Sequence, residues 1–341
     1  MSARVLVARL DSDGDVLLAG PAIRAVAAGG NAVTLLCGPS GAQAAALLPG
    51  VSETIEWTCP WIVPDAPVFD PASVHTLLER IAARRFDVAV VLTSFHQSSL
   101  PLALLLRLAG VPRTVAASVD YAGSLLDTRL RPDIDFLDDQ PEARRALSVA
   151  EAAGFALPPG DDGRLRVLSP PDTTALTGTG RYVVLHPGAS APARTWSPRR
   201  CAETVAALSE AGHRVVVTGG PGERDLTAVV SGVHGTDLGG RTSFSELAGV
   251  LAGAEVVVAG NTGPAHLAAS VGTPVISLFA PVVSARRWAP HGVPYRLLGD
   301  QRAACRGTRA RECPIPGHPC LNSVHPDAVV EAVHELQAVT V

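Results

Sequence analysis

The sequence predicts an α/β protein of two domains, each built around a parallel β-sheet. Short runs of β-branched residues alternate along the chain with longer segments whose apolar residues recur at helical spacing, which is the pattern of βαβ units. The chain has 341 residues, more than one ordinary hydrophobic core accommodates. Residues 169–180 are rich in Pro, Gly, Ser and Thr and separate two such alternating series, so we expect them to form the linker.

The first series predicts an N-terminal domain over residues 1–168. Its β-branched runs predict strands at residues 5–10, 32–36, 87–92 and 113–117. Segments of helical periodicity predict helices at residues 16–28, 73–85, 100–108 and 141–153. The alternation of the two element types favours parallel strands, because parallel neighbours need a long crossover between them.

The second series predicts a C-terminal domain over residues 181–325. Strands are expected at residues 182–185, 214–218, 255–259 and 274–279. Helices are expected at residues 198–211, 223–230, 245–252 and 263–271. A last helix, 326–336, lies in the terminal segment 326–341, and we expect this segment to pack back on the N-terminal domain.

Composition excludes several classes of protein. Hydrophobic residues make up 47% of the chain and charged residues 18%, which is typical of a globular protein. A net charge of -4 argues against a large nucleic-acid interface. No apolar run approaches the ~20 residues that span a bilayer, and charged residues such as Arg4 and Asp11 interrupt the N-terminal segment. We therefore expect a cytoplasmic protein with no nucleic-acid partner and no indication of membrane association.

All 28 basic residues are Arg, since the chain contains no Lys. Any phosphate site must therefore use guanidinium groups or backbone N–H groups. Among the six Cys residues, Cys305, Cys313 and Cys320 lie close together, with His318 between the last two. These four side chains could bind zinc, but their spacing is wider than that of a standard zinc knuckle. A reduced structural loop is the alternative.

The first candidate site is residues 9–18, RLDSDGDVLL, where a strand gives way to a helix. In open α/β folds, ligands bind at this carboxyl edge of the sheet. Gly14 permits a tight turn, and Asp15 falls at the start of the helix, where a carboxylate either caps free N–H groups or acts as a base. The segment lacks the Gly-x-Gly-x-x-Gly fingerprint, so a sugar-nucleotide-modifying nicotinamide enzyme has weak support.

Two loops of the second series carry further candidate residues. Residues 186–196, HPGASAPARTW, follow a strand, and Arg194 in this loop can grip a phosphate with its planar fork. The alternative is an ordinary loop with a surface Arg. Glu223, in residues 219–225, GGPGERD, could accept hydrogen bonds from a ribose or complement the dipole of the following helix.

The most specific segment is residues 259–269, AGNTGPAHLAA. A buried strand ends here, and a helix starts at Gly263 or Pro264. Thr262 and the free N–H groups of the first turn form an anion-binding nest at the helix N-terminus. His266 lies in the same turn, where it either contacts the anion or forms a structural hydrogen bond.

Taken together, these segments resemble glycosyltransferase family nine, the heptosyltransferase family, over nearly the whole chain. The residues that carry the resemblance are RLDSDGDVLLAGPAIRAV, VVLHPGASAPARTWSPRRCAETV, VVVTGGPGERDL and GNTGPAHLAASVGTPVISLFAP. The resemblance implies a GT-B fold, with two facing Rossmann-like domains and a cleft between them. It also implies an inverting, metal-independent transfer of a sugar from a nucleotide diphosphate donor, ADP-heptose, to an acceptor hydroxyl or amine, with no cofactor.

The resemblance assigns roles to individual residues. It implies that Asp15 is the general base and that the acceptor, a saccharide or small molecule, lies near Asp13, Gly14 and His96. The implied donor-binding residues are Arg194 on the phosphates, Glu223 on the ribose, and Asn261, Thr262, Gly263, Pro264 and His266 around the diphosphate.

Three positions depart from the family pattern. Asn261 stands where members often have Asp, Asp13 where they have an apolar residue, and Arg194 where they usually have Lys. The mildly acidic chain has no Lys for a membrane-facing patch, so a soluble acceptor stands beside a lipopolysaccharide-like glycan as an alternative. A non-catalytic nucleotide-sugar-binding relative is a further alternative, against which Asp15 argues.

Overall fold

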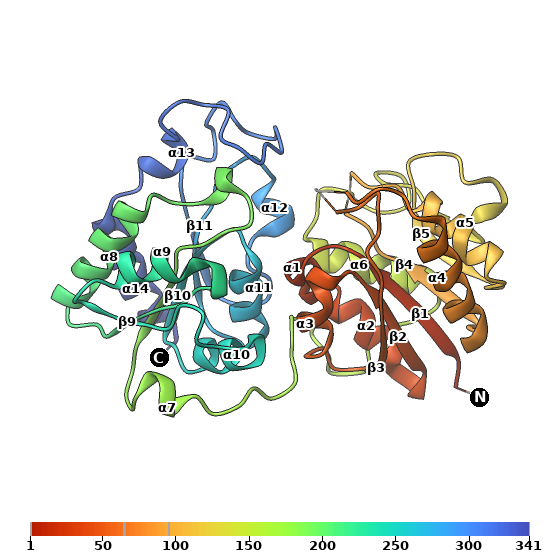
Figure 1. Cartoon of the computed structure of the whole chain (residues 1–341), viewed down its shortest axis with the longest axis horizontal. Helices are drawn as coiled ribbons and strands as arrows, with labels where there is room; N and C mark the ends of the chain where they lie inside the picture. The colour runs from red at the N-terminus through yellow and green to blue at the C-terminus, as the bar shows by residue number, and fades with distance from the viewer. Residues whose placement is uncertain (1, 64–65, 95, 341) are drawn as a thin grey trace. The chain divides into compact units, whose positions relative to one another are not determined.

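Figure 1 shows the chain as a computed structural model, which describes residues 2–63, 66–94 and 96–340. The chain divides into two compact units, Met1–Leu168 and Ser169–Val341. The division falls at the end of the expected N-terminal domain. Each unit contains a six-stranded sheet, and all paired strands are parallel. The α/β class predicted from the sequence is confirmed.

The first sheet has the strand order β3-β2-β1-β4-β5-β6. Its strands are β1 (Arg4–Arg9), β2 (Ala32–Cys37), β3 (Val51–Glu56), β4 (Val88–Val91), β5 (Thr114–Ala117) and β6 (Thr128–Leu130). The chain proceeds from β1 through β2 to β3 on one side and then returns to β4 on the other side of β1. This reversal creates a crevice at the carboxyl end of β1, the usual ligand position in such sheets.

Both faces of the first sheet are covered. Leu6 and Val7, consecutive residues of β1 that point to opposite faces, are both buried. The helices are α1 (Asp13–Leu18), α2 (Gly20–Ala27), α3 (Ala42–Ala45), α4 (Pro71–Arg84), α5 (Leu100–Leu108) and α6 (Glu142–Ala152). α2 packs against α6, and α4 packs against α5. α4 begins at Asp70, whose side chain accepts hydrogen bonds from the N–H groups of Ala72 and Ser73.

The second sheet has the strand order β12-β11-β10-β7-β8-β9. Its strands are β7 (Val183–His186), β8 (Val215–Val217), β9 (Gly235–Asp237), β10 (Val256–Gly260), β11 (Val275–Leu278) and β12 (Tyr295–Leu298). The strand order reverses between β7 and β10, so the loops after these two strands meet at a second crevice position.

In the second unit one helix precedes these strands, and the others lie between and after them along the chain (Figure 1). They are α7 (Thr174–Thr177), α8 (Pro198–Glu210), α9 (Arg224–Ser231), α10 (Phe244–Ala252), α11 (Gly263–Ser270), α12 (Ala285–Trp288), α13 (Pro319–Asn322) and α14 (Pro326–Thr340). Among the described helices, none combines the length and apolar character that a bilayer crossing requires.

The final helix, α14, differs from the expectation. Its buried residues Val329, Val333 and Leu336 belong to the core of the second unit, together with residues of α8 and of the sheet. The prediction that this segment packs back on the N-terminal domain is therefore wrong. The physical reason is that α8 and the strands of the second sheet already offer an apolar surface that the buried stripe of α14 covers.

Residues 169–180 also belong to the second unit. They contain α7 and pass close to α10, where a Cβ on Gly249 would lie 2.4 Å from the carbonyl oxygen of Pro171. The glycine in α10 allows this approach. The segment expected to be a linker is therefore packed against α10 along part of its length.

Candidate active site

The first candidate site lies at the carboxyl end of β1. Asp15 stands in the first turn of α1 with its side chain 21% exposed. Its Oδ1 accepts a hydrogen bond from Arg9 Nη2 at 2.9 Å, and its Oδ2 accepts one from Ser12 Oγ at 2.9 Å. The carboxylate is held at both oxygens but is still partly exposed. This is the position of the predicted base.

Arg9, the last residue of β1, is only 2% exposed. Its Nε lies 2.9 Å from Asp11 Oδ2, and its Nη2 also donates to Ser94 Oγ at 2.9 Å. Burial by itself would lower the pKa of Arg9, but the negative charges of Asp11, Asp15 and Glu142 outweigh burial and raise it. The sequence predicts no role for Arg9. The one signal is its position as a charged residue at the end of an apolar strand.

A second buried Arg connects this network to α6. Arg145 Nε lies 3.0 Å from Asp138 Oδ1, and Arg145 Nη1 donates to the carbonyl oxygen of Thr93, just after β4. Glu142 Oε2 lies 4.0 Å from both Arg9 Nη1 and Arg145 Nη1. The start of α6 and the end of β1 therefore share one buried network of charges.

Asp13 has a different environment from Asp15. Its Oδ1 accepts a hydrogen bond from the N–H of Ala44, in α3, at 2.9 Å. Burial raises the pKa of Asp13 to about 6, although this hydrogen bond acts in the opposite direction. Gly14 is buried in the same turn, and His96 is exposed in the segment after β4. The acceptor role of these three residues stays a prediction.

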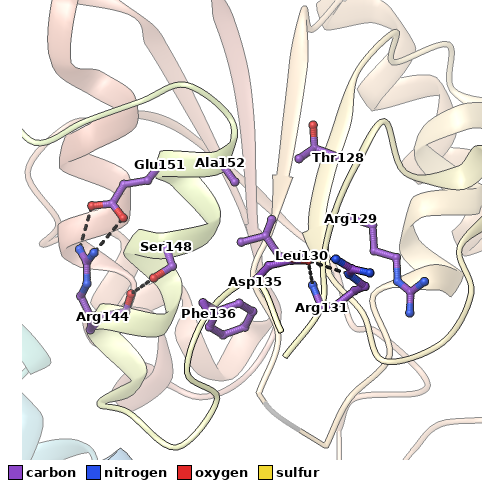
Figure 2. A pocket seen from close by; sticks show the side chains of 10 residues that line it. All are labelled: Thr128, Arg129, Leu130, Arg131, Asp135, Phe136, Arg144, Ser148, Glu151 and Ala152. Atoms are coloured by element: carbon purple, nitrogen blue, oxygen red, sulfur yellow. Dashed lines mark hydrogen bonds and ion pairs between the residues drawn. The ribbon is translucent and has the colours of Figure 1, made fainter. Parts of the chain in front are cut away.

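The first unit also has a cavity of about 700 Å³ between β6 and α6 (Figure 2). Arg131 pairs with Asp135 at 2.9 Å, and Arg144 pairs with Glu151 at 2.8 Å. Phe136 adds an aromatic ring to the lining. The cavity therefore combines paired charges with an apolar surface, and no sequence motif pointed to it.

The second candidate site lies at the carboxyl ends of β7 and β10. His186, at the end of β7, shares a hydrogen bond between Nδ1 and Thr218 Oγ1 at 3.0 Å, and its Nε2 lies 3.9 Å from Glu223 Oε2. Burial lowers the pKa of His186, while the charge of Glu223 opposes this effect. His186 is therefore neutral at pH 7.

Glu223 ends a 3-10 turn (Pro221–Glu223) and is 30% exposed. Its Oε2 accepts a hydrogen bond from the N–H of Gly220 at 2.7 Å, which caps the start of this turn. Gly188 makes room for this carboxylate, because a Cβ on residue 188 would lie 1.8 Å from Glu223 Oε1. The ribose contact of Glu223 stays a prediction.

Arg194 reaches the same edge of the second sheet on another 3-10 turn (Pro192–Arg194), where it is half-buried. Its backbone packs against the end of β10, since a Cβ on Gly260 would lie 2.8 Å from the carbonyl oxygen of Arg194. Gly260 directly precedes Asn261. This close approach brings the Arg194 loop against the segment of the predicted diphosphate site.

Asn261 and Thr262 lead from β10 into α11. Thr262 is the N-cap residue, with extended backbone, and its side chain makes no capping hydrogen bond within the described chain. Pro264 occupies the first turn, and Asn261 and His266 are each 3% exposed. The helix dipole favours an anion at this start, although Pro264 has no N–H and the N–H of Ala265 donates to the carbonyl oxygen of Thr262 at 3.1 Å.

The Cys-containing segment has a structural role. Cys305 and Cys320 lie in the core of the second unit, and Cys313 packs against that core. Burial raises the pKa of Cys320 to about 12, and His318 Nε2 lies 3.1 Å from the carbonyl oxygen of Ala193. Over residues 2–63, 66–94 and 96–340, no group of three His, Cys, Asp or Glu side chains is placed to hold a metal ion. These thiols therefore contribute to the packing of the second unit.

Comparison with known proteins gives a family match. The family model of glycosyltransferase family 9 (heptosyltransferase) matches residues 74–317, a range that begins after Asp15. Lipopolysaccharide heptosyltransferase 3 of Escherichia coli is 33% identical over 134 residues, which are 37% of this chain and 39% of that protein. This chain thus matches about two fifths of the length of that relative.

Two solved structures from Escherichia coli share the fold. ADP-heptose lps heptosyltransferase II superposes with a TM-score of 0.74 at 18% identity, covering 99% of both chains. Heptosyltransferase WaaC with ADP-2-deoxy-2-fluoro heptose superposes with a TM-score of 0.69 at 19% identity, covering 97% of this chain and 99% of that one. These similarities, with the two parallel sheets, confirm the predicted GT-B fold.

Proposed function

Because the chain belongs to glycosyltransferase family 9, the heptosyltransferase family, we propose that it transfers a heptose from ADP-heptose to an acceptor hydroxyl or amine. The transfer inverts the configuration of the anomeric carbon and uses no metal ion. The observation that carries the proposal is the close packing of the Arg194 backbone on Gly260, beside the uncapped start of α11.

The donor binds the second unit in this proposal. Arg194 and the N-terminal end of the α11 dipole are suitable for a diphosphate, because in a chain without Lys the permanently charged cations are all Arg. Asn261, Thr262 and His266 surround the same helix start, and Glu223 takes the ribose. The heptosyltransferase WaaC structure described with an ADP-heptose analogue supports this class of donor.

Asp15 is the proposed base. The acceptor oxygen or nitrogen forms a bond to the anomeric carbon while the bond from that carbon to the phosphate oxygen breaks. ADP leaves with the electron pair of the broken bond, and the acceptor proton passes to Asp15. Arg9 Nη2 donates a hydrogen bond to Asp15 Oδ1 and Ser12 Oγ donates one to Asp15 Oδ2, and these bonds hold the carboxylate that takes the proton.

The charge on the leaving ADP is stabilised by Arg194 and the α11 N-terminus in place of a metal ion. ADP binding and ADP release are therefore expected to continue in the presence of EDTA. Loss of both on chelation, with recovery on addition of Mg²⁺, would contradict the metal-free mechanism.

The acceptor is proposed to bind the first unit and to extend into the cavity beside β6 (Figure 2). The Arg131–Asp135 and Arg144–Glu151 pairs can exchange hydrogen bonds with hydroxyl groups, and Phe136 offers a face to a sugar ring. This lining fits a saccharide. Replacing both Arg144 and Glu151 with Ala should raise the KM of a saccharide acceptor and leave kcat nearly unchanged; an unaltered KM would remove the cavity from the site.

A screen of ADP-, GDP- and UDP-sugars by mass spectrometry tests the whole proposal. We expect binding of ADP-heptose and slow release of ADP even without an acceptor, with water as the nucleophile. Binding without any release would favour the non-catalytic alternative. Preferential binding of a nicotinamide dinucleotide would favour the oxidoreductase alternative.

A further inference from the structure

Arg9 is the centre of the most deeply buried charge cluster described in the first unit. Its side chain is 3% exposed, compared with 21% for Asp15. The guanidinium contacts Asp11 and Asp15 at 2.9 Å each, Ser94 Oγ at 2.9 Å, and lies 4.0 Å from Glu142. These partners come from the loop after β1, from α1, from the segment after β4 and from α6.

Carboxylates outnumber cations in this cluster. Arg9 and Arg145 are connected through ion pairs to Asp11, Asp15, Asp138 and Glu142. Burial raises the pKa of Asp11, although the charge of Arg9 opposes this rise. Arg9 is the cation that contacts both Asp11 and Asp15, at 2.9 Å each.

We propose that Arg9 is a positioning residue for the reaction: its Nη2, 2.9 Å from Asp15 Oδ1, orients the Asp15 carboxylate to accept the acceptor proton. This inference rests on the proposed function, because it assumes that Asp15 is the base. Ser12 holds the second oxygen of Asp15, but Ser12 is exposed at the start of α1. Arg9, in contrast, belongs to strand β1 inside the sheet. The sheet therefore sets the direction of the carboxylate through Arg9.

A merely structural counter-ion would give the same contacts, so the two roles must be separated. A counter-ion balances charge, and its loss can be offset by removing one carboxylate elsewhere in the cluster. Orientation of Asp15 cannot be restored in that way. Asp11 is suitable for the compensating change, because it forms an ion pair with Arg9 and its Oδ1 accepts a hydrogen bond from Gln97 Nε2, which an Asn side chain can also accept.

The experiment compares Arg9→Met, Arg9→Met/Asp11→Asn and Arg9→Lys with the wild type. Thermal unfolding is measured from pH 5 to pH 8, and ADP release from ADP-heptose is measured over the same range. Arg24→Met is the matched control, because Arg24 is a half-buried Arg of this unit, paired with Asp161 at 2.7 Å, and has no part in the proposed site.

We expect Arg9→Met to lose thermal stability, and to lose more as the pH rises, because buried carboxylates without a counter-ion must ionise. The double variant should recover most of the unfolding temperature while its kcat stays about 10–100-fold below wild type, the effect expected of a misplaced base. The pH of half-maximal activity on the acid side should move upward in both variants. KM for ADP-heptose should change little, and Arg24→Met should keep the wild-type kcat.

Arg9→Lys provides a second test if the double variant does not fold. One ammonium cannot reproduce the planar fork that contacts Asp11, Asp15 and Ser94, so kcat should fall although the charge is kept. Wild-type kcat and pH profile in either Arg9→Lys or the double variant would overturn the inference. A wild-type chain that releases no ADP from ADP-heptose would instead refute the proposed function, and this inference with it.

Discussion

Gly188→Ala tests how the second site holds Glu223. The added Cβ would lie 1.8 Å from Glu223 Oε1 and 2.5 Å from Glu223 Cδ, whereas real Cβ contacts stay above about 3.0 Å. Gly188 is not among the residues with positive φ, so the backbone accepts Ala and only the carboxylate must move. A displacement of at least about 1.2 Å breaks the 2.7 Å hydrogen bond from the Gly220 N–H.

This displacement sets the expected loss of ADP affinity in Gly188→Ala. A hydrogen bond to a charged group contributes about 1.5–3 kcal/mol. If the Glu223 carboxylate also binds the ribose, loss of that hydrogen bond weakens ADP binding by roughly 10–100-fold. The fold should survive, because a flexible carboxylate can turn toward solvent.

Calorimetric titration with ADP measures the ADP affinity and so tests this prediction. Gly188→Ala, Glu223→Ala and the double variant are compared, since a change that acts through Glu223 should add nothing once Glu223 is removed. Wild-type affinity in Gly188→Ala, or effects that simply add in the double variant, would refute the assignment of Glu223 to the nucleotide.

The remaining predictions concern single side chains. Asp15→Asn should lower kcat for ADP release by about 10²–10⁴-fold, as expected for a general base, and leave ADP affinity nearly unchanged. Asp13→Asn should affect kcat far less, and the reverse result would make Asp13 the base. Because burial raises the pKa of Asp13 to about 6, wild-type stability should decline as the pH rises from about 4 to about 6, and denaturant unfolding of Asp13→Asn should not show this decline. Arg194→Ala should weaken ADP binding by about 1.5–3 kcal/mol, and an unchanged calorimetric affinity would remove Arg194 from the donor site. Hydrogen bonds from Arg24 lower the pKa of Asp161 to about 2, so this stabilisation is present above about pH 4 and is lost as the pH falls toward 2. Arg24→Met should therefore reduce the unfolding free energy by about 1–2 kcal/mol at neutral pH, and a deficit that persists unchanged at pH 2 would show that packing dominates.

The strands divide clearly into those that the sequence predicts and those that it does not. The eight inner strands of the two sheets coincide with the expected strands, and the four edge strands, β3, β6, β9 and β12, were not expected. Inner strands are covered on both faces, so β4, β7, β8 and β11 are buried at every residue and read as continuous apolar runs. The edge strand β3 is mostly exposed and β12 has no fully buried residue, so their sequences need not be apolar.

The candidate sites were predictable to the level of the loop. Asp15, Arg194 and the start of α11 occur at carboxyl ends of strands, which follows from the alternation of elements alone. The partners of these residues did not follow from sequence. The contact of Arg9 with Asp15 depends on the direction of a side chain at the end of β1, and the role of Gly188 depends on a carboxylate from a different loop.

The place of α14 has a practical consequence for building hybrid enzymes. Since the last helix completes the core of the second unit, all elements of that unit are contiguous in sequence, from Ser169 onward. A single crossover after Leu168 would therefore exchange one complete unit for that of a relative. If the last helix had packed on the first unit, a second crossover before that helix would have been needed. Donor and acceptor preferences of different relatives could thus be combined by one fusion, with the joint placed ahead of the segment that packs on α10.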